Sequence, residues 1–324
     1  KGVYDFVEGL LGDELMTVRR TSRIFFNDRY FDYPPSFLNA LWGLGPLTSL
    51  KIAGSYLYER ARPNSRPVVT LEDWMIRQFG RRMFELFFKT YTEKVWGAPC
   101  HEIASIWASQ RIRGMSLAAA VRQAVYPSSD PPASMIDSFR YPRLGIGRIC
   151  EKMAEEMGER VMLGHEVAGL SRQGSAWRIT ARSEEQALEI EADQVISTAP
   201  VTDLVEIVSA PGPVREAASR LQFRDLILVA AMFDHPPLTR ESWIYVPDPE
   251  IIFGRFHEPS NFSPAMNPAG RTTIVFDLFC FRTDPLWSWP DERLLERALA
   301  DFKKVKLADE GFLSRLLGFK VIRA

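Results

Sequence analysis

The spacing of apolar residues changes along the chain, and it predicts a helical first part followed by a strand-rich second part. Apolar residues recur at helical spacing through residues 3–11, so the sequence opens in an amphipathic helix. Within residues 23–31, two short apolar runs flank Asn27-Asp28, a pair typical of a tight hairpin turn. Further helices are expected at residues 36–45, 47–61, 71–79, 81–96, 103–113 and 116–125.

After a polar, proline-rich loop at residues 127–132, the pattern turns to short segments of alternating polarity. A helix from Gly145-Ile146-Gly147 to about residue 157 leads into them. Their spacing of about ten residues favours an antiparallel meander, with strands at 160–163, 166–171, 177–182, 188–191 and 194–197. The last third has expected strands at 225–234, 243–246, 251–256 and 272–281, and helices at 202–208, 214–221, 291–304 and 311–317.

Composition narrows the class of protein. A chain of 324 residues with 46% apolar residues can bury a sizeable core, and its length favours about two domains. The 40 basic and 41 acidic residues leave a net charge of −1, which argues against a nucleic-acid-binding surface. No run approaches the ~18–20 apolar residues of a membrane span. We therefore expect a globular protein with neither a nucleic-acid partner nor a transmembrane segment.

The sequence predicts no metal site and contains no common catalytic motif. Cys100, Cys150 and Cys280 are too scattered for a disulfide framework or a zinc site, which favours a reducing, cytoplasmic compartment. The four histidines show neither HxxxH nor HxH spacing, and GxSxG, P-loop, HExxH and GxGxxG motifs are missing. Gly145-Ile146-Gly147 is read as a tight turn that starts a helix, with a loop that approaches a ligand's phosphates as the alternative.

Residues 87–97 form the most distinctive segment, Phe-Phe-Lys-Thr-Tyr-Thr-Glu-Lys-Val-Trp-Gly. By composition it is the end of a core helix, with Lys94 in the last turn and Gly97 after it. Other segments match one protein family in the order in which that family has them, among them Phe139-Arg140-Tyr141-Pro142-Arg143-Leu144-Gly145 and Asn261-Phe262-Ser263-Pro264. Together they resemble the flavin-dependent amine-oxidase superfamily, in its protoporphyrinogen-oxidase-like and UDP-galactopyranose-mutase-like branch, over about residues 5–323.

The resemblance implies a truncated α/β fold of the FAD/NAD(P)-binding type with a helical cap, an antiparallel meander and a mixed substrate-domain sheet. Residues 1–33 would start the substrate domain and residues 34–138 would form the helical cap. Residues 139–200 would supply a flavin-side loop, helix and meander, and residues 201–324 the substrate-domain sheet and helices.

The sequence also departs from the family. Members begin with a GxGxxG turn that binds the FAD pyrophosphate and end with a segment that closes the flavin site, and neither is found here. The chain begins inside a helix and ends in a strand-like run without a turn. We therefore expect the middle portion of an FAD-dependent oxidoreductase that, by itself, is inactive and does not hold FAD tightly.

The resemblance assigns some residues to the cofactor. The strand with Val167 meets the adenine through its backbone, and Thr198-Ala199-Pro200 passes beside the dinucleotide. An ordinary buried strand entering a turn is the alternative for the second segment. The turn with Arg143 and the loop with Gly145 and Gly147 would face the isoalloxazine, where Arg143 or Arg140 would balance a reduced, anionic flavin. A surface arginine is the alternative there.

Two substrate classes make different demands on the rest of the site. A nucleotide-sugar mutase needs arginines for a diphosphate, whereas an oxidase of a largely apolar substrate needs an aromatic pocket. The substrate-side candidates are Trp107, Arg224, Trp243, Tyr245, Arg255 and Asn261. A structural ion pair with Asp225 is the alternative for Arg224. We favour an oxidase of a C–N or C–C bond in a small molecule, and the alternatives are a mutase and a non-catalytic domain without cofactor.

Overall fold

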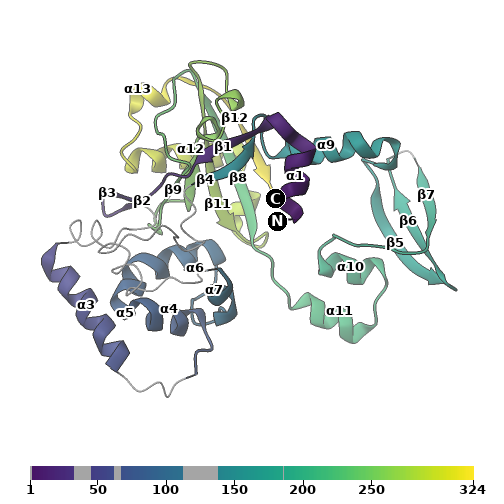
Figure 1. Ribbon diagram of the computed structural model, residues 1–324, viewed down its shortest axis with the longest axis horizontal. Coiled ribbons are helices and arrows are strands. Elements are labelled where there is room, and N and C mark those ends of the chain that lie inside the picture. Colours follow the sequence, from purple (N-terminus) through teal and green to yellow (C-terminus); the bar gives the residue numbers. More distant parts are fainter. Residues whose placement is uncertain (1, 33–44, 62–66, 112–137, 185) are drawn as a thin grey trace. The chain divides into compact units, whose positions relative to one another are not determined.

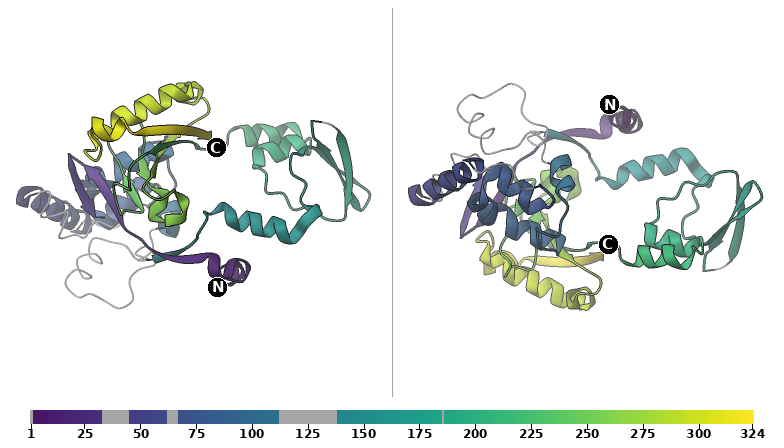
Figure 2. Two further views of the ribbon diagram at one scale, coloured as in Figure 1. Left: turned by 90° about the horizontal axis from the view of Figure 1, so that it is seen from above. Right: turned by 90° about the horizontal axis from the view of Figure 1, so that it is seen from below.

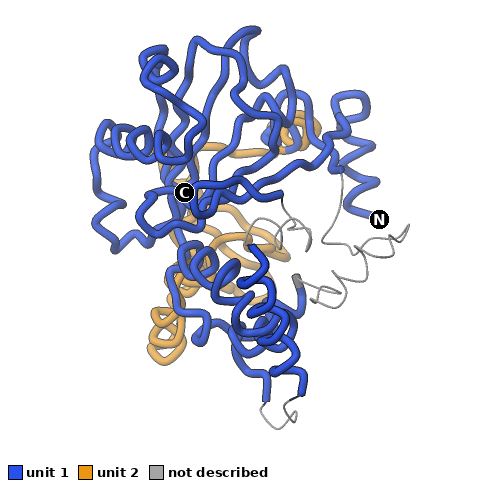
Figure 3. The backbone as a smooth tube through the Cα atoms, turned by 90° about the vertical axis from the view of Figure 1, so that its left-hand side faces the viewer, with its two compact units in different colours: residues 1–149, 224–324 blue, residues 150–223 orange. Residues whose placement is uncertain are grey.

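The computed structural model describes residues 2–32, 45–61, 67–111, 138–184 and 186–324. The chain divides into two compact units, one of residues 1–149 and 224–324 and one of residues 150–223 (Figure 3). The helices predicted at 36–45 and 116–125 and the loop at 127–132 lie outside the described residues, apart from residue 45. The division into residues 1–33, 34–138, 139–200 and 201–324 stays a prediction.

A seven-stranded sheet organises the first unit and takes strands from both parts of that unit's chain (Figures 1 and 2). Its order is β12 (Leu316–Arg323), β8 (Asp225–Phe233), β11 (Thr272–Cys280), β10 (Arg255–His257), β9 (Trp243–Tyr245), β2 (Ser22–Phe26) and β3 (Arg29–Asp32). The pair β2–β9 is parallel and the other neighbours are antiparallel. The sheet is therefore mixed, as the sequence predicts.

The hairpin β2–β3 confirms the turn predicted at Asn27-Asp28. The two turn residues have φ angles of 48° and 63°, a left-handed conformation that Asn and Asp tolerate better than other side chains. Phe25 pairs with Tyr30 and Ile24 with Phe31 across the hairpin. The turn thus sets a register in which Ile24 and Phe31 share one face and Phe25 and Tyr30 share the other.

Helices α12 (Asp291–Lys304) and α13 (Glu310–Leu313) cover one face of this sheet (Figure 1). Alternate residues of the central strands, such as Phe256 of β10 and Phe276 of β11, are fully buried there against Phe302 of α12. Burying each such side chain contributes roughly 1.5–3 kcal/mol. This face is the main hydrophobic core of the unit.

The helical cap contains α3 (Pro46–Ala61), α4 (Leu71–Phe79), α5 (Arg81–Met83), η2 (Phe84–Lys89), α6 (Thr90–Trp96) and α7 (Ser105–Arg111). Thr70 begins α4 with a capping box in which its hydroxyl accepts the Asp73 N–H. The helix predicted at 81–96 is interrupted by a π-helical turn at 84–89, which sequence spacing does not reveal. Phe87 in that turn contacts Phe26 and Phe31, so the cap packs on the face opposite α12.

An arm precedes the sheet. It consists of α1 (Gly2–Leu11), the 3-10 turn η1 (Gly12–Glu14) and β1 (Leu15–Arg19), and β1 pairs with β4 (Ser138–Pro142) as a separate two-stranded sheet. Arg140 on β4 donates to Glu8 on α1 over 3.0 Å and to Thr17 on β1. The sequence pattern predicted neither strand of this pair.

Helix α9 (Gly147–Met157) leads into the second unit, which holds the meander β5 (Glu166–Gln173), β6 (Ala176–Arg182) and β7 (Ala187–Ala192), with helices α10 (Val201–Ile207) and α11 (Gly212–Ser219). Two predicted strands are wrong. Residue 160 ends a 3-10 turn and residues 161–163 follow it outside any strand, while residues 194–197 form no strand with any of the described residues. Ile196 is 93% exposed, and an apolar run forms no strand without a neighbouring strand to pair with.

The described helices are all too short or too polar to cross a membrane.

Candidate functional site

The sheet face opposite α12 carries a row of polar side chains across three neighbouring strands. Tyr245 of β9 pairs with Arg255 of β10, and Arg255 pairs with Asp277 of β11. Because paired residues point to the same face, the three side chains form one row. Two positions along β10, His257 joins the same face and pairs with Val275. Intervening residues such as Phe256 and Phe276 lie in the core on the α12 side.

Asp277 is the centre of this row. Its side chain is 1% exposed, and its Oδ2 accepts a hydrogen bond from Arg255 Nε. Burial is the largest single influence and lowers the pKa of Arg255, but the charge and hydrogen bond of Asp277, together with Tyr91 and Tyr245, raise this pKa overall. Asp277 and Arg255 are therefore a charged, partly buried pair.

The second carboxylate oxygen of Asp277 has no hydrogen-bond partner among the described residues. Oδ1 lies 3.9 Å from His257 Nδ1, and both atoms are buried and unpaired. Burial lowers the pKa of His257 and outweighs the opposing effect of Asp277, so the imidazole is neutral at neutral pH. Buried polar atoms without a hydrogen-bond partner are uncommon in protein interiors, so these two facing atoms are candidates for polar contacts with a ligand.

The helical cap contributes Tyr91 to the same place. Its ring meets the Tyr245 ring edge-on, with ring centroids 5.5 Å apart. Both tyrosines also act electrostatically on Arg255 and favour its charged form. The candidate site is thus built from helix α6 and from strands β9, β10 and β11.

An aromatic cluster lies beside the polar row. Trp243 of β9 packs on Phe262 and on Phe139 of β4, with ring centroids 5.0 and 5.7 Å apart. Phe262 also contacts His257 at 5.4 Å and Tyr141 at 5.3 Å. Burial raises the pKa of Tyr141, so its phenol stays protonated at neutral pH. The cluster gives the site an apolar, aromatic flank.

Arg224 occupies a different position from the polar row. Its Nε donates to the Val95 carbonyl at 3.0 Å, and its Nη2 donates to the Lys94 and Phe279 carbonyls at 3.2 and 2.9 Å. The guanidinium also lies over the Phe281 ring, 4.3 Å from its centroid. Arg224 therefore satisfies the last carbonyls of helix α6.

The sequence offered an ion pair with Asp225 as the alternative role of Arg224, but the structure pairs Arg224 with Asp284. Its Nη1 lies 3.7 Å from Asp284 Oδ2, whereas Asp225 pairs with Arg282 at 2.9 Å. Gly97 lies directly against this guanidinium, with a φ of +66° and only 2.5 Å between an added Cβ and Arg224 Nη1. A side chain at position 97 would displace the arginine.

The family model for flavin containing amine oxidoreductases matches residues 31–313. The chain belongs to the flavin containing amine oxidoreductase family. The resemblance in the sequence is thereby confirmed, together with the expected α/β fold of the FAD-binding amine-oxidase type. The chain is thus related to flavin-dependent oxidoreductases.

Solved structures share this fold at low sequence identity. A reduced UDP-galactopyranose mutase matches with a TM-score of 0.81 and 18% identity, covering 99% of this chain and 69% of that one. A putative protoporphyrinogen oxidase from Exiguobacterium sp. 255-15 matches with a TM-score of 0.73 and 16% identity, covering 99% of this chain and 72% of that one. Putrescine oxidase bound to putrescine matches with a TM-score of 0.62 and 14% identity, covering 99% of this chain and 71% of that one. These similarities describe the family's fold and leave the substrate open.

Two further substrate-side candidates of this chain, Asn261 and Trp107, make contacts outside the polar row. Asn261 donates from Nδ2 to the Glu241 carbonyl at 2.8 Å and to Thr239 Oγ1 at 3.3 Å, which joins two loops at the end of β9. Trp107 lies on α7 in the core of the helical cap, edge-on to Trp96 with centroids 5.2 Å apart. The structure brings Trp243, Tyr245 and Arg255 onto one sheet face and places Trp107 and Asn261 elsewhere.

The cofactor-side candidates fall in both units. Arg143 is exposed, and Gly145 follows it with a φ of +102° in a turn closed by its N–H on the Pro142 carbonyl at 3.0 Å. Gly147 has open space around it at the start of α9. In the second unit, Val167 of β5 is half exposed next to a β-bulge, and residues 198–200 form an exposed turn before α10.

Each of these segments is accessible within its own unit. Residues 198–200 of the second unit are exposed, and in the first unit an added Cβ at Gly147 would meet nothing within 4 Å, whereas one at Gly145 would lie 3.2 Å from Met266. A pyrophosphate needs several converging N–H donors, and the GxGxxG turn that supplies them is missing from the sequence. Among the described residues, no three His, Cys, Asp or Glu side chains converge to hold a metal ion.

Sequence reasoning missed Asp277, His257 and Tyr91 as site residues. A signal for Asp277 was available, because it is the one charged residue of strand Thr272–Cys280 and its neighbours from residue 274 to residue 280 are all apolar. A carboxylate in such a strand is costly unless it is paired or functional. His257 and Tyr91 carry no comparable signal, since their proximity depends on strand register and on the packing of α6.

Proposed function

We propose that the protein oxidises a C–N or C–C bond of a largely apolar small molecule, which binds at the sheet face of Tyr245, Arg255 and Asp277. The observation that carries the proposal is the state of the two candidate arginines. Arg224 is engaged with three backbone carbonyls, and Arg255 is engaged with Asp277. The Arg224 guanidinium therefore presents no uncommitted fork of the kind that binds a diphosphate, and the charge of Arg255, whose Nε donates to Asp277, is balanced by that carboxylate.

The flank of the site supports the same substrate class. Trp243 and Phe262 form an apolar wall, and Tyr91 and Tyr245 add aromatic surface with polar edges. Such a mixture binds a flat or extended apolar group while the few polar atoms orient it. The neutral His257 and the unpaired oxygen of Asp277 are the groups that would hold a proton or orient a polar atom of the substrate.

FAD is the cofactor that the family implies, and it would accept the electrons released from the substrate. The contribution of this chain is to bind and orient the substrate, and to exclude water from it with the aromatic flank. The proposed cofactor-facing residues are Val167, Thr198, Ala199, Pro200, Arg143, Gly145 and Gly147. Because the GxGxxG turn is missing, we expect residues 1–324 alone to bind FAD weakly, and a flavin absorbance spectrum of the purified chain tests this.

A nucleotide-sugar mutase is the second candidate, supported by the similarity in fold to UDP-galactopyranose mutase. The two candidates differ in what they bind, so titration calorimetry with uridine diphosphate separates them. An oxidase should show no measurable affinity. A mutase should bind the ligand, and Arg224→Ala or Arg255→Ala should weaken that binding about ten- to a hundred-fold, as losing a charged hydrogen bond does.

The calorimetry needs the protein in a form that holds its cofactor, so that weak binding is not caused by an incomplete site. Lys51→Ala serves as the control because this lysine is exposed on α3. Tight binding that either arginine substitution abolishes, while Lys51→Ala leaves it unchanged, would reverse the proposal in favour of the mutase. A third candidate, a non-catalytic domain, predicts neither ligand binding nor substrate oxidation.

A further inference from the structure

Lys94, near the end of α6, binds backbone rather than a carboxylate. Its Nζ donates to the carbonyl oxygens of Val246, Asp248 and Phe253 at 3.0, 2.7 and 2.7 Å. An ammonium group has three donors, so all three are used within one loop. That loop, residues 246–254, connects β9 to β10.

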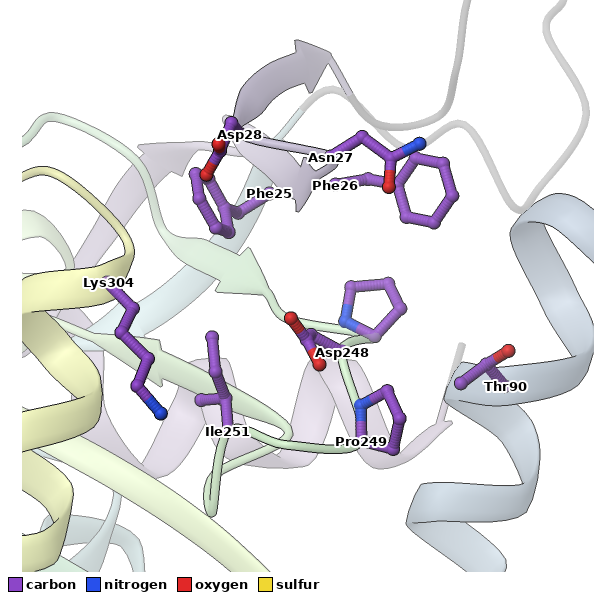
Figure 4. A pocket seen from close by; sticks show the side chains of 10 residues that line it. Phe25, Phe26, Asn27, Asp28, Thr90, Asp248, Pro249, Ile251 and Lys304 are labelled. Carbon is purple, nitrogen blue, oxygen red and sulfur yellow. The ribbon is translucent and has the colours of Figure 1, made fainter.

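The same loop is held from its other side by helix α12. Asp301 accepts the Ile252 N–H at 2.7 Å, and Arg297 donates to the Glu250 carbonyl at 2.7 Å. Figure 4 shows Asp248 and Pro249 between the hairpin turn at Asn27-Asp28 and Thr90 of α6, where they line a cavity of about 610 Å³. The loop is thus fixed between two helices, and Lys94 supplies the contacts on the α6 side.

Arg224 makes a connection in the opposite direction. It precedes β8 and donates to the carbonyls of Lys94 and Val95, while Lys94 donates to the loop between β9 and β10. The end of α6 and the sheet therefore exchange charged hydrogen bonds in both directions. Hydrogen bonds of this kind are stronger and more directional than neutral ones.

Lys94 joins two segments that each carry a residue of the candidate site, helix α6 and the loop that follows β9. Tyr91 lies one helical turn before Lys94 on α6, and Tyr245 immediately precedes Val246, whose carbonyl Lys94 binds. The two tyrosine rings meet at 5.5 Å. A displacement of α6 relative to the loop would therefore change the separation of these rings directly.

We propose that Lys94 is a positioning residue of the candidate site, which holds the β9–β10 loop on α6 and so sets the contact between Tyr91 and Tyr245. The clamp itself stands on the contacts above, and only its consequence for substrate binding rests on the proposed function. Asp248 from the loop and Asp301 from α12 are the charged groups that face Lys94. The clamp joins the helical cap to the strands that carry Tyr245 and Arg255.

The test measures the tyrosine contact without any substrate, so it stands or falls separately from the proposed function. Fluorotyrosine is introduced at position 245, and the chemical shift of its ¹⁹F resonance depends on how close the Tyr91 ring lies. Tyr91→Leu gives the chemical shift expected when that ring is absent. Lys94→Gln should move the resonance towards the Tyr91→Leu value. Lys51→Gln, at an exposed lysine of the same cap, should leave it at the wild-type value.

Hydrogen exchange gives a second measurement on the loop. The Val246 and Gly254 amides are hydrogen-bonded in the native protein, to the Gly254 and Asp277 carbonyls. At a pH below the Lys94 pKa of about 7, where its side chain is an ammonium, Lys94→Gln should speed their exchange about ten- to a hundred-fold, because the loop loses its charged anchor. Lys94→Arg keeps the charge but cannot direct a planar group at three carbonyls, so an intermediate effect is expected.

Two results would overturn the proposal. One is a wild-type ¹⁹F resonance in both Lys94 variants, even if they unfold more easily, because Lys94 would then stabilise the fold without positioning the tyrosines. The other is unchanged exchange of the Val246 and Gly254 amides in both variants. If Lys94→Gln does not fold, Lys94→Arg alone decides the matter by the same two measurements.

Discussion

The two faces of the seven-stranded sheet use the same strands for different purposes. Towards α12, Phe256 and Phe276 are fully buried against Phe302. On the opposite face, their sequence neighbours Arg255 and Asp277 form a charged pair. One face is packed with apolar side chains, whereas on the other Asp277 Oδ1 and His257 Nδ1 are buried without a hydrogen-bond partner in the described part of the chain.

The difference teaches where chemistry resides in this fold. A buried polar atom without a partner costs roughly 1–3 kcal/mol, so a surface required only for packing would carry apolar residues at positions 257 and 277. Alternation along a strand allows one side to provide stability while the other retains such costly groups. The face of Tyr245, Arg255 and Asp277 is therefore the better candidate for function, independently of any relative.

The largest effect expected is on the packed face. Phe276→Ala removes a fully buried ring that contacts Phe253, Phe256 and Phe302, and it should lower the free energy of unfolding by about 3–5 kcal/mol through lost burial and a cavity. Urea denaturation measures the loss. A loss below about 1 kcal/mol would mean that this face tolerates vacancies and would remove the contrast between the faces.

A smaller effect is expected one residue further along β11. Asp277→Asn keeps the shape of the side chain but removes the charge opposite Arg255, which should cost roughly 1–3 kcal/mol of stability. It should also lower the pKa of His257 further, because the carboxylate of Asp277 opposes the effect of burial there.

NMR titration of the His257 ring and urea denaturation measure the two effects of Asp277→Asn. Asp234→Asn is the matched control, since Asp234 pairs with Arg271 at the surface and such pairs contribute about 0–1 kcal/mol. An unchanged or raised His257 pKa in Asp277→Asn would show that the two groups do not interact, and the polar row would lose its central pair.

Local patterns predicted much of the fold. The Asn27-Asp28 turn, the helix at residues 71–79 and the strand that contains Phe276 follow from side-chain preference and periodicity. The π-helical turn at 84–89 and the pairing of β1 with β4 depend on tertiary packing, which no short window contains. The strand predicted at 194–197 is absent because its apolar residues have no partner strand in the described chain.

The site was harder to predict than the fold. Tyr245 and Arg255 could be named from residue chemistry, but the pairing of Arg255 with Asp277 needs the register of β10 on β11. Arg224 shows the limit most clearly. An arginine suited to a phosphate is instead bound by carbonyls from residues 94, 95 and 279, which are distant in sequence. Contacts to backbone carbonyls leave no trace in the side-chain pattern.

The last prediction concerns the pH dependence of stability and the partly buried Lys94 of α6. Burial lowers the pKa of Lys94 to about 7 from its ordinary 10.5, although Asp248 and Asp301 oppose this shift. Between these values, the unfolded chain binds a proton that the folded protein has lost, so the contribution of Lys94 to stability rises with pH across this window. Lys94→Gln should remove this rise.

Urea denaturation of wild type and Lys94→Gln across the window measures this difference. The gap between them should shift in favour of the wild type as pH increases, whereas Lys51→Gln should follow the wild type throughout because Lys51 is exposed. Phe276→Ala, which changes only the packed face, should lower stability by a constant amount at every pH. Parallel profiles for wild type and Lys94→Gln would mean that Lys94 titrates alike in the folded and unfolded states, and that burial of its ammonium group carries no net cost.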